Sequence, residues 1–299
     1  MQFLKNTNIN FASKTFITTI CSTIIILIGI ISLIYNGGPA LSIDFTGGNI
    51  AQLKLEKALD ISNIRASLIN TGLDGAEIIE FGSPKEILIK TQYEGTGKEL
   101  INLLQKGIDV PFTIERFEKI GPKIGDELRS DAINAIIAAL LLISIYISFR
   151  FDRFYAYGSL AALTHDILIT LGIFSILNID IDLTIIAAFL TIVGYSLNDT
   201  IVVFDRIRET QIKFPKKDFN WIVNTSLNSS LSRTIITSLT TLLVVVILFI
   251  SGGAVIKNFA FALIVGVLVG TYSSIFIASP VMKYFEIKND VKQKEELTE

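Results

Sequence analysis

Two charged residues stand within or beside long apolar segments, where an ionised side chain can take part in proton chemistry. Asp199 lies in one apolar segment, and Arg233 stands at the start of the next one along the chain. Charge in hydrocarbon is costly, so such residues usually face a cavity, a partner or a proton path. The two residues therefore indicate a membrane transport protein rather than a passive anchor.

The residues around this pair predict two polar helix faces at one depth. Asp199 precedes Asp205, where the following loop begins, by six residues. At 1.5 Å per residue this places it about 9 Å inside the apolar segment. Arg233 enters the next segment from the same side and can reach a similar depth. The predicted polar surroundings are Tyr195, Ser196 and Asn198 on the first helix, and Thr237, Thr240 and Thr241 on the second.

The two charges form a switch if the helices that carry them move. Burial favours the neutral form of a carboxylate, and a guanidinium within a few ångströms favours the charged form. Separation of Asp199 from Arg233 would therefore load a proton, and their approach would release it. Two alternatives stay open: a static ion pair that fixes helix register, and an arrangement in which the two never meet.

His165 and Asp166 form a second polar site, midway along the third apolar segment. Histidine is the side chain whose ordinary pKa lies near neutrality. For His165, structural hydrogen bonds to neighbouring helices are the simpler interpretation. A carboxylate near the middle of the bilayer is harder to explain in that way, so Asp166 could extend a relay toward Asp199.

Composition excludes several functional classes. The chain has 299 residues, of which 51% are hydrophobic and 18% are charged, below the roughly 25% of soluble domains. Its net charge of −2 predicts no affinity for nucleic acid. No His, Cys or carboxylate cluster has metal-ligand spacing, and we find neither a Gly-rich phosphate loop nor a nucleophile elbow. We therefore expect no metal, no cofactor and no enzymatic activity.

Six apolar segments are each close to the roughly 20 residues that cross a bilayer. They cover residues 15–35, 130–149, 156–177, 183–204, 234–251 and 258–282, so the last five fall within 130–282. Basic residues follow the second and fourth segments and occupy the tail, and they mark the cytoplasmic side. We therefore expect an inner (cytoplasmic) membrane protein with residues 1–14 and 283–299 in the cytoplasm. The first segment is longer than a typical signal-peptide core, which favours an uncleaved anchor over a cleaved signal.

Residues 36–129 have the composition of a soluble extracytoplasmic domain. Asp60 can cap one helix, and Thr96 with Glu99 forms the capping box of another. We predict strands at 49–55, 76–81, 86–91 and 112–120, with a turn over 82–85. The order β-α-β-β-α-β is that of a ferredoxin-like sandwich. The predicted fold class is thus a six-helix polytopic membrane protein with a small α+β domain, which offers a binding surface.

Glycines precede the first strand of this domain, in Asp44-Phe45-Thr46-Gly47-Gly48. Gly47 and Gly48 suggest a backbone with positive φ or a close approach of two chains. A tight turn and a functional hinge, with Asp44 as its polar residue, both fit the motif.

Two further patterns concern packing and the cytoplasmic interface. The sixth segment carries small residues every four positions, at Ala262, Gly266, Gly270, Ser274 and Ala278. Such a stripe permits close helix packing, within the bundle or against a partner. The segment 205–232 mixes charges with aromatic residues, which is typical of an amphipathic helix at the membrane surface and, as a weaker alternative, of a docking site.

Long motifs of the chain resemble the SecF family of protein-export membrane subunits. The similar segments are Val193 to Glu209, Leu231 to Thr241, Ile43 to Gly48 and His165-Asp166, and the resemblance covers about residues 10 to 285. Ser42 departs from the glycine expected before Ile43. This difference weakens the inference about a hinge and leaves the membrane residues untouched.

The resemblance implies a place in the RND superfamily of proton-driven transporters, which are built from two six-helix halves. SecD would be the other half and an obligate membrane partner, and the SecYEG channel and YajC would associate with the pair. The proton-motive force, without a cofactor, would promote preprotein translocation and release on the outer side. The family's membrane aspartate and arginine correspond to Asp199 and Arg233.

Two other functions stay open. Half of an RND-type exporter of small molecules or lipids would predict a larger outer domain with a lined pocket. A non-transporting scaffold of the translocon would tolerate Asp199→Asn, whereas a proton carrier would not.

Overall fold

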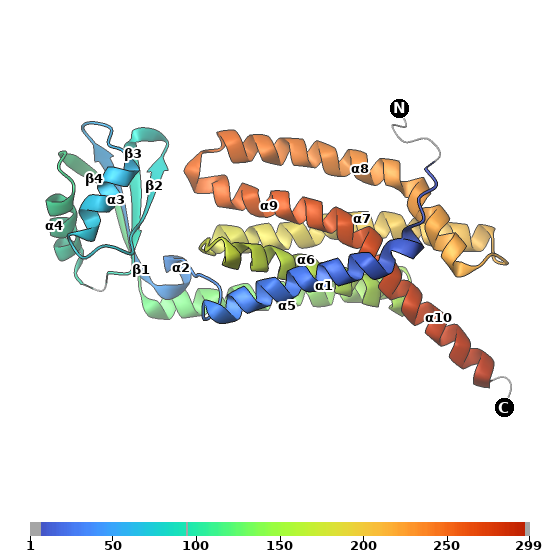
Figure 1. The fold of residues 1–299 in the computed structure, drawn as a ribbon. Helices are drawn as coiled ribbons and strands as arrows, with labels where there is room; N and C mark the ends of the chain where they lie inside the picture. The colour runs from blue at the N-terminus through green and yellow to red at the C-terminus, as the bar shows by residue number, and fades with distance from the viewer. Residues whose placement is uncertain (1–6, 94, 297–299) are drawn as a thin grey trace.

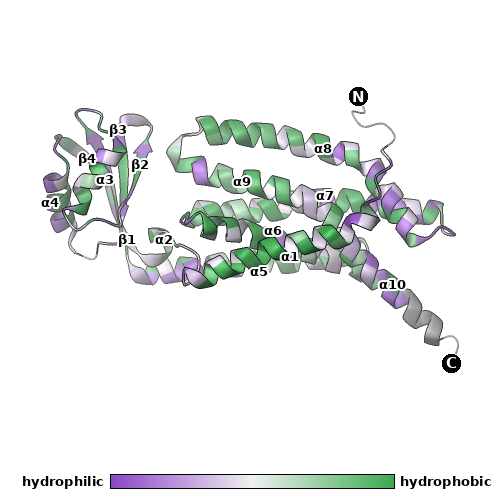
Figure 2. Cartoon of the chain, viewed as in Figure 1, coloured by the Kyte–Doolittle hydropathy of each residue, from purple (hydrophilic) through white to green (hydrophobic). Residues whose placement is uncertain are grey.

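The computed structural model describes residues 7–93 and 95–296, so the first six residues of the predicted cytoplasmic N-terminus and the last three of the tail lie outside it. A helical bundle and a small α+β domain lie end to end, and both termini emerge at the bundle end farther from the domain (Figure 1). We call these the terminal end and the domain end. Hydrophobic residues run along the bundle between two more polar ends (Figure 2).

Six helices within the described ranges are long and apolar enough to cross a membrane, which confirms the predicted fold class. The last span, Gly253–Asn289, is a composite in which a π-helix interrupts the α-helix. The bundle consists of α1 (Phe11–Tyr35), α5 (Pro122–Arg150), α6 (Arg153–Ile176), α7 (Leu183–Lys213), α8 (Phe219–Ser251), α9 (Gly253–Ser273), the π-helix η1 (Ser274–Ala278) and α10 (Ser279–Glu296).

The segment 205–232 differs from its expected form as a separate interfacial helix. It consists of the ends of α7 and α8, joined by a short turn. Helical hydrogen bonding continues past the point where apolar composition stops, because each end packs against the other. Ser226 Oγ of α8 lies 2.9 Å from Thr210 Oγ1 of α7, and the Asp218 side chain caps α8 by accepting from the amide of Asn220 at 2.9 Å.

The domain is a four-stranded antiparallel sheet with two helices. Its elements are β1 (Gly48–Leu55), α3 (Ile61–Ile69), β2 (Glu77–Phe81), β3 (Ser83–Thr91), α4 (Gly97–Gly107) and β4 (Phe112–Ile120). The sheet order β2-β3-β1-β4 is the one that a β-α-β-β-α-β chain makes in a ferredoxin-like sandwich. Buried Leu53, Ile64 and Leu100 join the sheet to the two helices. The predicted topology is confirmed.

Local signals set most boundaries of the domain. The Asp60 carboxylate accepts from the Ser62 amide at 2.8 Å, and Thr96 and Glu99 form both bonds of the predicted capping box. The turn between β2 and β3 is shorter than the predicted 82–85, because Gly82 at φ +78° lets Ser83 pair directly with Phe81.

The segment after α1 fastens the domain to the bundle. Leu41 forms a parallel bridge with Ile181, which lies between α6 and α7. Ser42, the position that departs from the expected glycine, accepts from the amide of Asp44 through its hydroxyl at 3.2 Å and caps the short helix α2 (Ile43–Thr46). Asp44 in turn accepts from the first amide of α7, that of Leu183, at 3.2 Å. This segment thus has a defined structure that touches α7.

Gly47 and Gly48 both have positive φ, at +79° and +157°. A Cβ on Gly48 would lie 2.5 Å from the carbonyl oxygen of Thr91, so the backbone approaches another strand closely there. Gly48 also pairs with Ile120, the last residue of β4. The domain therefore joins the bundle through two connections that run side by side.

The small-residue stripe of α9 packs within the bundle. A Cβ on Gly270 would lie 2.9 Å from the Cβ of Ser196, and one on Gly266 would overlap the side chain of Ile192. Both neighbours belong to α7, so the stripe brings α9 against the helix that carries Asp199.

Candidate functional site

Asp199 is buried between three helices, with 2% of its surface exposed. Its carboxylate accepts a hydrogen bond from Ser238 Oγ of α8 at 3.3 Å. Ser238 Oγ also lies 2.6 Å from Thr271 Oγ1 of α9, which donates to the carbonyl of Val267 at 2.7 Å. Because the hydroxyl hydrogen of Thr271 is used there, Ser238 divides its own hydrogen between Thr271 and Asp199. The hydrogen bond that Ser238 makes to Asp199 is thus long and shared.

Arg233 lies on α8 and is exposed on the surface of the bundle. It is near enough to Asp199 to interact with it electrostatically, yet the ion pairs found within 4.0 Å among the described residues do not include these two. An exposed arginine in a membrane-spanning helix needs a partner or a path to the interface. The predicted pair therefore sits on neighbouring helices in an open arrangement.

Three buried hydroxyl groups on the helices around Asp199 make no hydrogen bond to the residues that the structure describes. The side-chain oxygens of Tyr195, Thr200 and Thr234 are buried and have no protein partner within the described part of the chain. Tyr195 and Thr200 flank Asp199 on α7, and Thr234 precedes Ser238 by one turn on α8. Buried hydroxyls usually find a partner, so these three are available to water or to a changed position of the carboxyl group.

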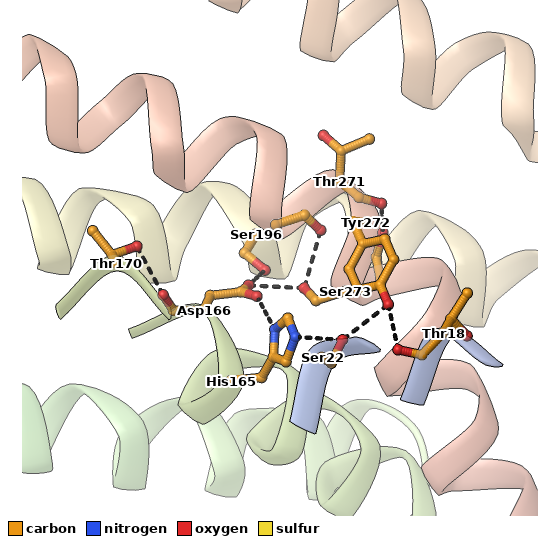
Figure 3. A network of polar contacts seen from close by, with 11 residues as sticks. Thr18, Ser22, His165, Asp166, Thr170, Ser196, Thr271, Tyr272 and Ser273 are labelled. Carbon is orange, nitrogen blue, oxygen red and sulfur yellow. Dashed lines mark hydrogen bonds and ion pairs between the residues drawn. The ribbon is translucent and has the colours of Figure 1, made fainter. Parts of the chain in front are cut away.

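His165 and Asp166 form a second buried cluster, 5% and 1% exposed, that joins four helices (Figure 3). One carboxylate oxygen of Asp166 accepts from Ser196 of α7 at 2.6 Å and from Ser273 of α9 at 2.8 Å. The other lies 2.9 Å from His165 Nδ1. The remaining ring nitrogen, Nε2, lies 3.1 Å from Ser22 Oγ of α1.

The register of α1 against α6 brings Ser22 to His165. The two helices touch where a Cβ on Gly29 would lie 2.8 Å from the Cα of Gly172, which allows a very close approach. Three residues further along each helix, Ser32 Oγ lies 2.9 Å from Ser175 Oγ. The same offset applied two turns earlier pairs Ser22 with His165. The glycine contact thus positions a hydroxyl beside a buried imidazole.

Only some of the residues predicted around Asp199 lie beside it in the structure. Ser196 donates to Asp166 instead, because α7 lies between α6 on one side and α8 on the other. Asn198 is exposed. The hydroxyl of Thr241 donates to the carbonyl of Thr237 at 3.0 Å. Thr237 donates to the carbonyls of Arg233 and Thr234 at 3.0 and 2.9 Å, and its hydroxyl also lies close enough to act on the carboxylate of Asp199, as predicted.

Several residues of the two clusters carry no clear signal in the sequence. Ser22, Ser238, Thr271, Tyr272 and Ser273 make the contacts that join helices. A lone serine or threonine in an apolar helix reads equally well as a packing residue. Ser273 stands beside the small-residue stripe, which was the nearest available indication.

Comparisons with known proteins agree with this architecture. A family described as "Protein export membrane protein SecD/SecF, C-terminal" matches residues 101–288. Protein translocase subunit SecF of Thermodesulfovibrio yellowstonii is 44% identical over 289 residues, covering 94% of this chain and 96% of that protein. The SecF subunit of Vibrio alginolyticus is 46% identical over 243 residues, covering 79% and 77%.

A solved structure has the same fold. The crystal structure of SecDF from Thermus thermophilus, described as a translocon-associated membrane protein, aligns with a TM-score of 0.83 and 36% identity. The alignment covers 96% of this chain but 40% of the SecDF chain. This chain therefore corresponds in length to less than half of that protein.

Proposed function

The chain belongs to the SecD/SecF family of protein-export membrane proteins, and on that premise we propose that it is a SecF-type subunit of the Sec translocase. In this role it uses the proton-motive force to promote preprotein translocation across, and release from, the cytoplasmic membrane. The support is similarity to SecF subunits over nearly the whole chain. The chain's own part is to move protons, not to catalyse a covalent reaction.

A SecD-type protein is the membrane partner that we propose. The SecDF chain extends well beyond the part that this chain matches, which leaves room for a second half. SecYEG, YajC and the translocating preprotein are the further partners. Arg150 ends α5, Arg153 begins α6 and Arg206 lies in the last turns of α7, and these helix ends are at the terminal end of the bundle (Figure 1), which supports a cytoplasmic location of both termini.

The observation that carries the proton role is the environment of Asp199. Its carboxylate is buried, yet it is held by a long, shared hydroxyl bond, with Arg233 nearby and unpaired with it. In a static ion pair, the guanidinium of Arg233 would contact the carboxylate of Asp199 directly. An open arrangement lets a helix movement change the partners of Asp199, and a change of partner alters its affinity for a proton.

Preprotein export by vesicles carrying Asp199→Asn tests this proposal. Inverted vesicles are assayed with and without a proton gradient, at matched levels of the chain and its partner. We expect the mutant to assemble and to lose the gradient-dependent part of export, while ATP-driven export without a gradient is unchanged.

Asp205→Asn is the matched control, because it makes the same change on the same helix. Asp205 is half-exposed and pairs with Arg150 at 3.3 Å. An Asp199→Asn protein whose export keeps its full gradient dependence contradicts the proton role and makes the scaffold function the better one.

A further inference from the structure

The hydrogen bonds beyond His165 have a fixed direction. Tyr272 donates its one hydroxyl hydrogen to the carbonyl of Thr18, at 2.8 Å. Tyr272 therefore accepts from Ser22, whose Oγ lies 2.9 Å away. Since the hydrogen of Ser22 is used in that bond, His165 Nε2 must donate to Ser22 across 3.1 Å. The chain of bonds in Figure 3 thus requires a hydrogen on Nε2.

The bonds on the other side of the ring place one more proton. Asp166 Oδ2 already accepts from the hydroxyls of Ser196 and Ser273. A proton bound by the carboxyl group therefore sits on Oδ1, which faces His165 Nδ1 at 2.9 Å. Whether this proton belongs to the carboxyl or to the ring, one proton lies between the two residues and the pair is neutral overall.

We propose that His165 and Asp166 together form a second proton-binding site, separate from Asp199. Binding of the proton sets the direction of the hydrogen bonds that Ser22 of α1 and Tyr272 of α9 make. Its use in transport rests on the proposed function, whereas its ability to bind a proton does not. The ligand is the proton itself, exchanged with water.

Unloading follows from the same bonds. When the loaded pair gives one proton to a water molecule, hydronium forms and one hydrogen stays on the ring. That hydrogen sits on Nδ1, because a bare Nδ1 would face the carboxylate of Asp166. Nε2 then accepts from Ser22, Tyr272 turns to donate to Ser22, and the carbonyl of Thr18 loses its donor. The hydroxyl chain ends at this carbonyl, so it can reverse its direction but cannot conduct a proton further.

The groups that face the pair come from three helices. Within the described residues, Tyr272 is the titratable side chain that joins the network from α9, and its ring stacks on the imidazole with centroids 5.9 Å apart. The contacts from α1 and α7 are made by hydroxyls, those of Ser22 and Ser196. Asp199, one turn beyond Ser196, turns to α8. The charge of the pair is therefore set by the proton that it shares.

The network ends where α9 changes its geometry. The π-helix η1 begins directly after Ser273, and Ser279 Oγ donates to the carbonyl of Ser274 at 3.0 Å. Single π-helical turns inside α-helices are frequent at functional sites. A reversal of the hydrogen bonds between Ser22 and Tyr272 therefore changes the contacts of α9 directly beside its π-helical turn.

Nuclear magnetic resonance of the imidazole nitrogens tests the proposal on the full chain in lipid nanodiscs. His165 is the single histidine of the sequence, so ¹⁵N-histidine labelling gives the signals of one ring. We expect the loaded pair to show a hydrogen on Nε2, and the unloaded pair, reached by raising the pH, to show its one remaining hydrogen on Nδ1. A ring that keeps the same hydrogens when the pH is raised, or that retains the one on Nε2, overturns the proposal.

Tyr272→Phe tests the link to α1 and α9. Without the phenol oxygen, Ser22 loses the acceptor that fixes its hydrogen in the loaded state, so it is free to donate to Nε2 and the unloaded state is favoured. We expect a smaller fraction of the rings to carry a hydrogen on Nε2 in this variant than in the wild type at the same pH. Tyr284→Phe is the control, because Tyr284 is exposed on α10. An unchanged fraction in Tyr272→Phe contradicts the coupling of the pair to the hydroxyls of Ser22 and Tyr272.

Export assays separate this proposal from the function on which it rests. Asp166→Asn should lower gradient-dependent export roughly tenfold or more if the site serves transport. Wild-type dependence in Asp166→Asn, beside a loss in Asp199→Asn, removes the site from transport while the nitrogen spectra still decide whether it binds a proton. Wild-type dependence in both variants contradicts the proposed function itself.

Discussion

Thr271 and Ser273 stand two residues apart on α9, and their hydroxyls contact two different buried clusters. Thr271 bonds with Ser238, which donates to Asp199, whereas Ser273 donates to Asp166. The helix α7 joins the same clusters, because Ser196 and Asp199 lie one turn apart on it. A shift of α9 against α7 would therefore alter the partners of both aspartates together.

Ser238→Ala should weaken proton coupling without abolishing it. The change removes the hydroxyl that donates to Asp199 and leaves the carboxyl group in place. A hydrogen bond to a charged group contributes about 1.5–3 kcal/mol, so we expect gradient-dependent export to fall roughly tenfold. Ser230→Ala is the control, since Ser230 is equally buried on α8 and bonds to carbonyls of its own helix. Equal export by the two variants would show that Ser238 does not tune Asp199.

Gly270→Val should destabilise the bundle. Its Cβ would lie 2.9 Å from that of Ser196, so α9 and α7 must separate or Ser196 must move. Overpacking of this kind costs about 1–3 kcal/mol, which should appear as a lower thermal midpoint in detergent. Gly194→Val is the matched change on α7, where an added Cβ would meet nothing within 4 Å, so this variant should be tolerated. An unchanged midpoint for Gly270→Val would mean that the stripe packs loosely.

The domain and the number of spans could be predicted because their signals are local. Alternation, caps and glycines act within a few residues, as the capping box of Thr96 and Glu99 and the pairing at Gly82 show. The charges Asp199 and Asp166 could also be found, since a carboxylate in an apolar helix is conspicuous by its type alone.

The partners of these charges could not be predicted, because they depend on helix packing over long separations. Ser22 and Tyr272 are 250 residues apart in sequence, and their contact exists because α1 and α9 both lie against α6. Ser196 lies three residues before Asp199 on the same helix, so its spacing predicted a contact with Asp199. In the structure α7 packs against α6 with Ser196 facing that helix, and Ser196 donates to Asp166 instead. Helix periodicity defines a face, not the neighbour that the face meets.

Thr96→Ala should loosen the start of α4. The threonine oxygen accepts from the Glu99 amide at 3.3 Å, and the Glu99 carboxylate accepts from the Thr96 amide at 2.8 Å. Loss of an N-cap costs about 1 kcal/mol. Hydrogen exchange of residues 97–107 in the intact chain should therefore become roughly fivefold faster. Thr113→Ala, at an exposed position of β4, is the control, and equal exchange in both variants would deny the cap any stabilising role.

The contact between the domain and the bundle should strengthen in acid. Asp180, in the loop before α7, is an exposed residue, but the protein atoms around it displace part of its water, which raises the pKa of its carboxyl above the ordinary value of 3.8, while Lys90 of β3 acts in the opposite direction. A raised pKa means that the folded arrangement prefers the neutral carboxyl, so its stabilising effect is complete below 3.8 and is lost as the pH rises through the raised value. Because β2 contacts α9, hydrogen exchange of residues 77–81 should slow as the pH falls through this window, after correction for intrinsic rates. Asp180→Asn should remove that dependence and Asp74→Asn, at an exposed position of the domain, should keep it; the same pH dependence in both variants would assign the effect to another group.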